Sequence, residues 1–208
     1  MYKRVLKRGL DILLSIIGLI LTSPILLMTS IAIRIESKGP IIFKQNRIGE
    51  KGKVFKIYKF RSMIVGAEKG GVYETKGDKR VTKVGKFIRK TSIDELPQLL
   101  NILKGEMSII GPRPVLTYHP WKYEEYNQEQ LKRFEIKPGV TGLAQVNGRK
   151  DVEWNRRIEF DVEYVKKVSF IYDLRILFKT ISKVFLMKDN VNVGETVVSS
   201  SEKIEEKV

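Results

Sequence analysis

The longest feature of the hydrophobic pattern is an uncharged, apolar run from position 12 to position 33. As a straight helix rising about 1.5 Å per residue, it would be about 33 Å long, enough to cross the hydrocarbon core of a bilayer. A secretory signal peptide is disfavoured, because the run exceeds the usual apolar core of about 7–15 residues and no small-residue cleavage site follows it. The pattern therefore predicts a membrane segment.

The charges on both sides of this run bear on its topology. Basic residues lie before it at positions 3, 4, 7 and 8, and others follow it from position 34 to position 61. Because basic flanks favour the cytoplasmic side, a single span would leave one of them on the wrong side. A helix that enters the bilayer and leaves by the same face satisfies both.

Pro24 lies where such a helix has to turn. Proline lacks an N–H and its ring crowds the preceding turn, so a kink is expected, and the hydroxyls of Thr22 and Ser23 can bond the freed backbone groups. We expect a re-entrant membrane helix over residues 1–36, broken at Ser23 and Pro24. A kinked span remains the alternative, since proline is tolerated in true spans.

Beyond the run, the pattern changes to short elements punctuated by glycine and proline. Alternating side chains predict a strand at 54–60, and four glycines predict a mobile loop at 64–80. Helices are expected at 83–90, at 94–103, at 121–134 as a solvated outer helix, and from position 154 onward. Apolar residues at three-and-four spacing in 171–186 fit a helix in the bilayer interface and a core-facing helix equally well.

The expected fold is therefore an α-rich α/β protein with two structured parts. A re-entrant helical hairpin would lead into a small cytosolic domain at 37–188, with short helices, interfacial amphipathic helices and a little β structure. Residues 189–208 form a polar tail that we expect to be disordered.

Composition and charge limit the chemistry. The 208 residues contain no cysteine and one histidine, which excludes a disulfide framework, a thiol nucleophile and the His clusters of most zinc or iron enzymes. Any metal must be held by oxygen ligands. The net charge of +15 predicts an anionic partner: nucleic acid, an anionic bilayer face or a phosphorylated substrate.

Two adjacent carboxylates, Asp94 and Glu95, lie among these cations. One interpretation is a capping box, in which Ser92 caps a helix and Glu95 reaches back to it. Pro97 would then occupy an unfavourable interior position, so the helix could instead begin near Pro97. We expect the nearby cations to keep both carboxylates ionised, and such carboxylates suit a nucleophile or a magnesium ligand.

Two arginines lie on turns shaped by glycine or proline. Arg113 belongs to the Gly-Pro-Arg-Pro segment at 111–114, which must be extended, and Arg149 ends the segment KPGVTGLAQVNGR at 137–149. Arginine in such a frame suits bidentate phosphate binding, although a solvated arginine on a surface turn is an equally ordinary interpretation of either one.

Several long motifs in one order resemble the bacterial sugar transferase family, the small monotopic phosphoglycosyl transferases, over about residues 1–188. They are Ser23-Pro24, KGPIIFKQNRIG at 38–49, FKIYKFRSM at 55–63, TKVGKFIRKTSIDELPQLLNILKGEMSIIGPRP at 82–114, and the segment at 137–149. The resemblance implies transfer of a sugar 1-phosphate from a UDP-sugar to polyprenyl phosphate, such as undecaprenyl phosphate, with release of UMP. This is the initiating step of bacterial glycoconjugate and exopolysaccharide synthesis.

The resemblance also implies roles for individual residues. Asp94 corresponds to an aspartyl nucleophile, and Glu95 to a partner acid that, with Asp94, is associated with Mg²⁺. Ser23 and Pro24 match the break in a re-entrant helix on the cytoplasmic face of the bacterial cell membrane. The residues expected to bind substrate phosphate or nucleotide are Lys59, Arg89, Arg113 and Arg149.

The expected partners are the UDP-sugar, the polyprenyl phosphate and membrane lipid, without nucleic acid; self-association is left open. The competing hypothesis is a non-catalytic, membrane-anchored basic protein that binds anionic lipid or nucleic acid. It predicts strongly salt-dependent binding without turnover and leaves the Asp94–Glu95 pair unexplained.

Overall fold

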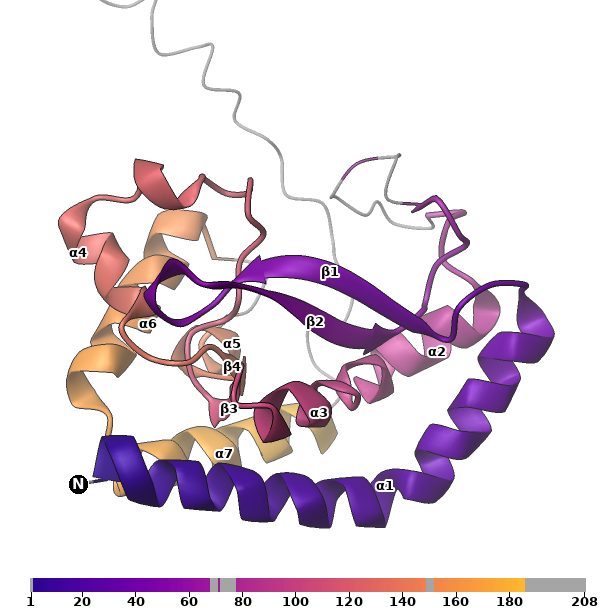
Figure 1. The fold of residues 1–208 in the computed structure, drawn as a ribbon, viewed down its shortest axis with the longest axis horizontal. Coiled ribbons are helices and arrows are strands. Elements are labelled where there is room, and N and C mark those ends of the chain that lie inside the picture. Colours follow the sequence, from indigo (N-terminus) through magenta and orange to yellow (C-terminus); the bar gives the residue numbers. More distant parts are fainter. Residues whose placement is uncertain (1, 68–70, 72–77, 149–151, 186–208) are drawn as a thin grey trace, which may run out of the picture.

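The computed structural model describes residues 2–67, 71, 78–148 and 152–185. Figure 1 shows the long helix α1 (Lys7–Glu36) running along the base of the molecule and then rising along one side. The hairpin of strands β1 and β2 and a set of short helices fill the space above it. The fold is therefore helix-rich with little sheet, as the sequence predicts.

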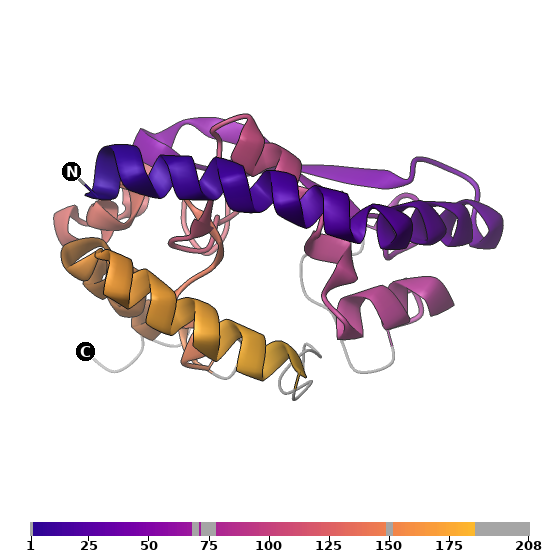
Figure 2. The ribbon, with the colours of Figure 1, turned by 90° about the horizontal axis from the view of Figure 1, so that it is seen from below.

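Helix α1 is bent near its middle (Figure 1), whereas its two arms follow one another almost in line when seen from below (Figure 2). Pro24 lies inside the helix and cannot donate to the carbonyl of Ile20. The hydroxyl of Ser23 donates to that carbonyl at 2.8 Å, and Thr22 Oγ1 donates to the carbonyl of Gly18 at 2.7 Å. The predicted role is therefore confirmed for Ser23, whereas Thr22 bonds a carbonyl that Pro24 does not free.

The surface of α1 is largely apolar and uncovered. The helix is long and apolar enough to cross a membrane, and only 11% of its most apolar 18 residues is buried. A core helix of a soluble protein would bury far more. The exposed large apolar side chains along it include Leu13, Ile16, Ile20, Leu21, Leu27, Met28, Ile31 and Ile35.

Both ends of α1 are bonded to the rest of the chain. Near its start, Arg8 donates to the last carbonyls of α3 (Gln98–Leu103) at 2.6 and 3.0 Å, and Asp11 accepts the Ser108 hydroxyl at 3.0 Å. At its end, the Glu36 carboxylate accepts the first two N–H groups of α2 (Lys83–Lys90) at 2.6 and 3.0 Å. One domain therefore holds the two ends of the apolar helix.

Two small sheets lie above α1. Strands β1 (Ile42–Ile48) and β2 (Val54–Phe60) form an antiparallel pair, so the predicted strand is confirmed. Strands β3 (Ser108–Ile110) and β4 (Gly139–Thr141) pair in parallel. A Cβ at Gly139 would lie 2.1 Å from the Gly111 nitrogen, so this close approach requires glycine.

Helices α2 and α3 carry the chain past the carboxylate pair. Helix α2 spans the residues predicted for it and lies against the segment after β2: a Cβ on Gly85 would meet the Ser62 carbonyl oxygen at 1.9 Å. Helix α3 begins after Pro97 rather than at Asp94, so the expected helix over 94–103 is shortened from its start. The alternative start near Pro97 is confirmed.

The single outer helix predicted at 121–134 is wrong. The segment consists of the 3₁₀ turn Tyr123–Glu125, the helix α4 (Gln128–Leu131) and the 3₁₀ turn Lys132–Phe134. Asn127 caps a new helix by accepting from the Gln130 N–H at 2.9 Å, which ends any continuous helix there. Tyr126 and Phe134 both enter the core, so this segment is not a solvated layer.

The C-terminal part is helical. A short helix α5 (Leu143–Val146) precedes α6 (Trp154–Lys167) and α7 (Phe170–Phe185). Helix α7 buries Ile176 in a core cluster, so it is partly core-facing, and it also exposes a second apolar stripe. Its placement in a bilayer interface stays a prediction. Figure 2 shows α7 and α1 on the same underside. The exposed stripe consists of Phe170, Ile171, Leu174, Phe178 and Ile181. Most of the loop predicted at 64–80, and the tail at 189–208, lie outside the described residues.

Candidate active site

The carboxylate pair lies on the 3₁₀ turn Ile93–Glu95, between α2 and α3. Ser92, just before it, has a left-handed backbone (φ 59°) and its side chain makes no capping bond. The Glu95 Oε1 instead accepts from Lys59 Nζ at 2.8 Å and from Arg113 Nη2 at 3.2 Å. The capping-box interpretation is therefore wrong, and Glu95 is a partner of two cations.

The cations come from separate elements that the fold brings together. Lys59 lies near the end of β2, Arg89 near the end of α2, and Arg113 on the turn after β3. Asn101 of α3 joins this helix to β2: its Oδ1 accepts the Tyr58 N–H at 2.9 Å and its Nδ2 donates to the Lys56 carbonyl at 2.8 Å. Sequence reasoning missed Asn101, whose role depends on which strand lies beside α3.

Two arginines, the partly buried Arg47 and the buried Arg133, hold the turn that presents Arg113. Arg133 donates to the Arg113 carbonyl at 3.0 Å, and Arg47 donates to the Pro114 carbonyl at 3.1 Å. Arg133 is itself fixed by a fully buried ion pair with Asp161, at 2.5 Å. Because both carbonyls are occupied, the turn is rigid and the Arg113 side chain remains available to the site.

Burial dominates the electrostatics of Asp94. It raises the pKa of Asp94, and the Glu95 carboxylate acts in the same direction, whereas Lys59, Arg89 and Arg113 oppose the rise. Desolvation therefore outweighs the three cations in its effect on this pKa, and the ionised state of Asp94 stays a prediction. Among the described residues, the Asp94 carboxylate has no hydrogen-bond or ion-pair partner. It is a partly buried acid within the field of three cations.

A further cation lies at the edge of this cluster. Burial lowers the pKa of Arg47 to about 10, with repulsion from Arg113 in the same direction, whereas Glu95 and Tyr118 oppose the change. Arg47 therefore adds positive potential beside Arg113. Sequence reasoning assigned no role to Arg47. The available signal was the alternation of side chains along β1, which turns Arg47 to the face opposite the exposed Asn46.

The structure thus brings together five of the predicted site residues: Asp94, Glu95, Lys59, Arg89 and Arg113. Arg149, the sixth, lies outside the described residues. Over the described part of the chain, no group of three or more Asp, Glu, His or Cys side chains could bind a metal. Two carboxylates still fit Mg²⁺, because this ion is commonly bound by one or two carboxylates together with substrate phosphates and water.

Comparison with known proteins adds independent information. A family model described as "Bacterial sugar transferase" matches residues 2–187. A UDP-glucose:undecaprenyl-phosphate glucose-1-phosphate transferase of Escherichia coli is 44% identical over 191 residues, with 89% of this chain and 41% of the relative covered. An undecaprenyl-phosphate galactose phosphotransferase of Salmonella typhimurium is 43% identical over 202 residues, with 89% and 41% covered.

The chain therefore spans about two fifths of the length of the first of these curated relatives. A relative of similar size is the uncharacterized sugar transferase EpsL of Bacillus subtilis, 46% identical over 184 residues, with 88% of each chain covered. The matched region includes the carboxylate pair and the cations around it.

Proposed function

The chain belongs to the bacterial sugar transferase family, and we propose that it transfers a sugar 1-phosphate from a UDP-sugar to polyprenyl phosphate. The products are a polyprenyl diphosphate sugar and UMP. The relatives whose names state an acceptor use undecaprenyl phosphate, and several are named for a UDP-sugar donor, which supports both choices.

The observation that carries this proposal is the partly buried carboxylate of Asp94, which has no described bonding partner and lies within the field of three cations. Structural carboxylates in protein interiors are normally paired or hydrogen-bonded. A carboxylate without such partners is available to form a bond, and the cations around it suit the phosphates of a nucleotide sugar.

The chemistry follows in two steps. An oxygen of ionised Asp94 attacks the phosphorus that bears the sugar; the bond from that phosphorus to the bridging oxygen breaks, and UMP leaves with the electron pair. The sugar phosphate is then held as an acyl phosphate on Asp94. An oxygen of polyprenyl phosphate attacks the same phosphorus, and the Asp94 carboxylate leaves and is restored.

The cations lower the barrier to both steps. An anion has to approach an anionic phosphate, and Lys59, Arg89 and Arg113 offset that repulsion in a partly water-excluded site. Glu95, held by Lys59 and Arg113, is placed to accept a proton from the acceptor phosphate. Mg²⁺ bound by Asp94 and Glu95 with the diphosphate would supply further charge neutralisation.

We also propose that α1 is re-entrant and seats the domain on the cytoplasmic face of the membrane. The exposed apolar surface of α1, its bend and the Ser23 bond at Pro24 support this arrangement. The bonds at its two ends support it further, because a straight span would place those ends about 30 Å apart on opposite sides of the bilayer. The basic flanks favour the cytoplasmic side.

Turnover tests the function directly. The full chain is incubated with undecaprenyl phosphate, Mg²⁺ and a panel of UDP-sugars, and released UMP is measured. We expect repeated UMP release with one or a few donors when acceptor is present, and at most one UMP per protein molecule without it. Salt-dependent binding of lipid or nucleic acid without any UMP release would instead favour the non-catalytic alternative.

Topology needs a separate test. Tags at the N-terminus and at the C-terminal end of the full chain should both resist an outside reagent in intact cells. Labelling of the N-terminal tag alone would show a true span and contradict the re-entrant arrangement.

A further inference from the structure

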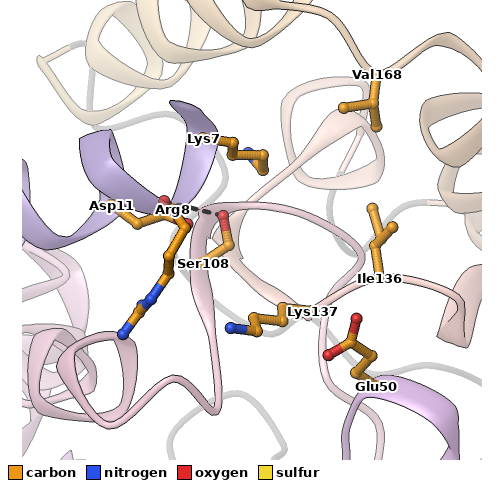
Figure 3. A pocket seen from close by; sticks show the side chains of 8 residues that line it. All are labelled: Lys7, Arg8, Asp11, Glu50, Ser108, Ile136, Lys137 and Val168. Atoms are coloured by element: carbon orange, nitrogen blue, oxygen red, sulfur yellow. Dashed lines mark hydrogen bonds between the residues drawn. The ribbon is translucent and has the colours of Figure 1, made fainter. Parts of the chain in front are cut away.

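A second polar site lies at the start of α1, away from the residues around Asp94. A cavity of about 220 Å³ is lined by two apolar residues, Ile136 and Val168, and six polar ones. Figure 3 shows the polar side chains reaching it from different segments of the chain. None of the lining residues belongs to the Asp94 cluster. The polar lining residues are Lys7, Arg8, Asp11, Glu50, Ser108 and Lys137.

Most of these charges are already satisfied. Lys7 forms an ion pair with Asp173 at 2.6 Å, and Asp11 accepts from the Ser108 hydroxyl and the Ile109 N–H at 3.0 and 2.9 Å. The Arg8 guanidinium donates to two helix carbonyls, which leaves its positive charge uncompensated. These residues form a rigid frame with one excess cation.

Two side chains are not satisfied. Among the described residues, neither the Lys137 ammonium nor the Glu50 carboxylate has a hydrogen-bond or ion-pair partner. A side chain at Gly105 would meet Arg8 Nη2 at 3.6 Å and Lys137 Nζ at 3.7 Å, so these cationic atoms are no more than 7.3 Å apart. One phosphate group can bridge such a pair with charge-assisted hydrogen bonds of about 2.7–2.9 Å.

The size and the place of the cavity narrow the choice of ligand. It is smaller than the pockets of about 300–1,000 Å³ that hold drug-sized ligands, so a sugar nucleotide does not fit. Its lining includes Lys7, which follows the exposed Leu6, and Val168, which lies two residues before the exposed Phe170 at the start of α7. A molecule with a small anionic head and apolar chains matches both features, and basic pockets between membrane helices bind lipid headgroups.

We propose that this cavity binds the phosphodiester headgroup of an anionic phospholipid, with the acyl chains on the exposed faces of α1 and α7. Arg8 and Lys137 hold the phosphate, and Glu50 accepts a hydroxyl of the headgroup glycerol. Glu50 also disfavours a dianionic phosphate monoester, because its carboxylate would lie near the extra charge. The proposal rests on the proposed membrane seating, but the lipid site requires no turnover.

Native mass spectrometry of the detergent-solubilised full chain, titrated with phosphatidylglycerol, tests the site. We expect Lys137→Gln to weaken binding about tenfold or more, as for one lost charge-assisted hydrogen bond. Lys53→Gln removes one charge from an exposed position of the β1–β2 connection and is the matched control. Equal weakening in both variants would overturn the proposal, since non-specific attraction would explain it.

Binding of other lipids and competition with other phosphates identify the ligand. Phosphatidylcholine, which has no hydroxyl or ammonium donor in its headgroup, should bind more weakly than phosphatidylglycerol, and Glu50→Gln should reduce that preference. An unchanged preference would overturn the role of Glu50. Displacement of phosphatidylglycerol by equal concentrations of inorganic phosphate or undecaprenyl phosphate would overturn the choice of a phospholipid.

Discussion

Two differently bonded aspartates distinguish the candidate active site from the junction of α1 and α7. Asp173, at that junction, is 5% exposed and accepts from the Tyr2 and Tyr164 hydroxyls at 2.5 and 2.6 Å and from Lys7 Nζ at 2.6 Å. Asp94 is partly buried, yet no described residue bonds to its carboxylate. The first carboxylate is used for structure, and the second remains available for reaction.

This difference has a physical cost at Asp94. A buried carboxylate without hydrogen bonds is less stable in its charged form, which raises its pKa. The cations around it reduce that cost without removing it. A carboxylate that has to react is expected in such an environment. Hydrogen bonds or ion pairs to both of its oxygens would make it a poor nucleophile.

The largest expected effect is on catalysis at Asp94. Asp94→Asn keeps the shape of the side chain but removes the nucleophilic oxygen anion, so UMP release should fall on the order of 10³-fold or more. Measuring UMP release with the preferred donor checks this. Asp173→Asn is the comparison variant, and its folded fraction should retain activity. Near-normal turnover in Asp94→Asn would remove the distinction between the two aspartates.

A smaller effect is expected for the cations. Lys59→Met removes a positive charge that acts on Asp94 and a partner of Glu95, and should lower kcat/KM by about 10²-fold. Lys56→Met changes an exposed lysine of the same strand and is the matched control, for which we expect less than about a twofold change. Similar losses of kcat/KM in the two variants would show that Lys59 acts through the net charge of the protein and not through its position beside Asp94 and Glu95.

The structural aspartate should affect stability instead. Asp173→Asn leaves the buried Lys7 ammonium without its anion, and should lower the free energy of unfolding by about 3 kcal/mol. Thermal unfolding of the detergent-solubilised protein measures this as a lower Tm. An unchanged Tm would mean that the junction of α1 and α7 does not depend on this ion pair.

The smallest effect is a gain of stability at Asp94. Because the folded protein raises the pKa of Asp94, the folded state binds its proton more tightly than the unfolded state. Stability of the wild type should therefore fall as pH rises from below the usual Asp pKa, near 4, through the raised value. Asp94→Asn lacks this loss, so its Tm should exceed that of the wild type at neutral pH, with a gap that closes in acid. A gap that widens in acid would contradict the direction of the pKa shift.

Local patterns predicted some elements well. The strand at 54–60 and the helix at 83–90 follow from alternation and helix signals within a few residues, and the Ser23 bond at Pro24 follows from backbone chemistry alone. The segment 121–134 failed because Tyr126 and Phe134 are pulled into one core by tertiary packing. The three-residue strands β3 and β4 are too short to leave a periodic signal.

The site was only partly predictable. Motif resemblance indicated Asp94, Glu95 and their cations, but the raised pKa of Asp94 was not predicted, because desolvation depends on surrounding atoms that the sequence does not show. Arg47 and Asn101 were missed for the same reason: each acts through a backbone group of a distant segment.

The central claim is that Asp94 becomes covalently bonded to the sugar phosphate of the donor. The most direct measurement is mass spectrometry of the full chain after incubation with the preferred UDP-sugar and Mg²⁺, without acceptor. We expect a mass increase of one sugar phosphate on the peptide that contains Asp94, removed by adding undecaprenyl phosphate and absent in Asp94→Asn. Absence of any adduct on Asp94, under conditions in which product still forms once acceptor is added, would contradict the claim.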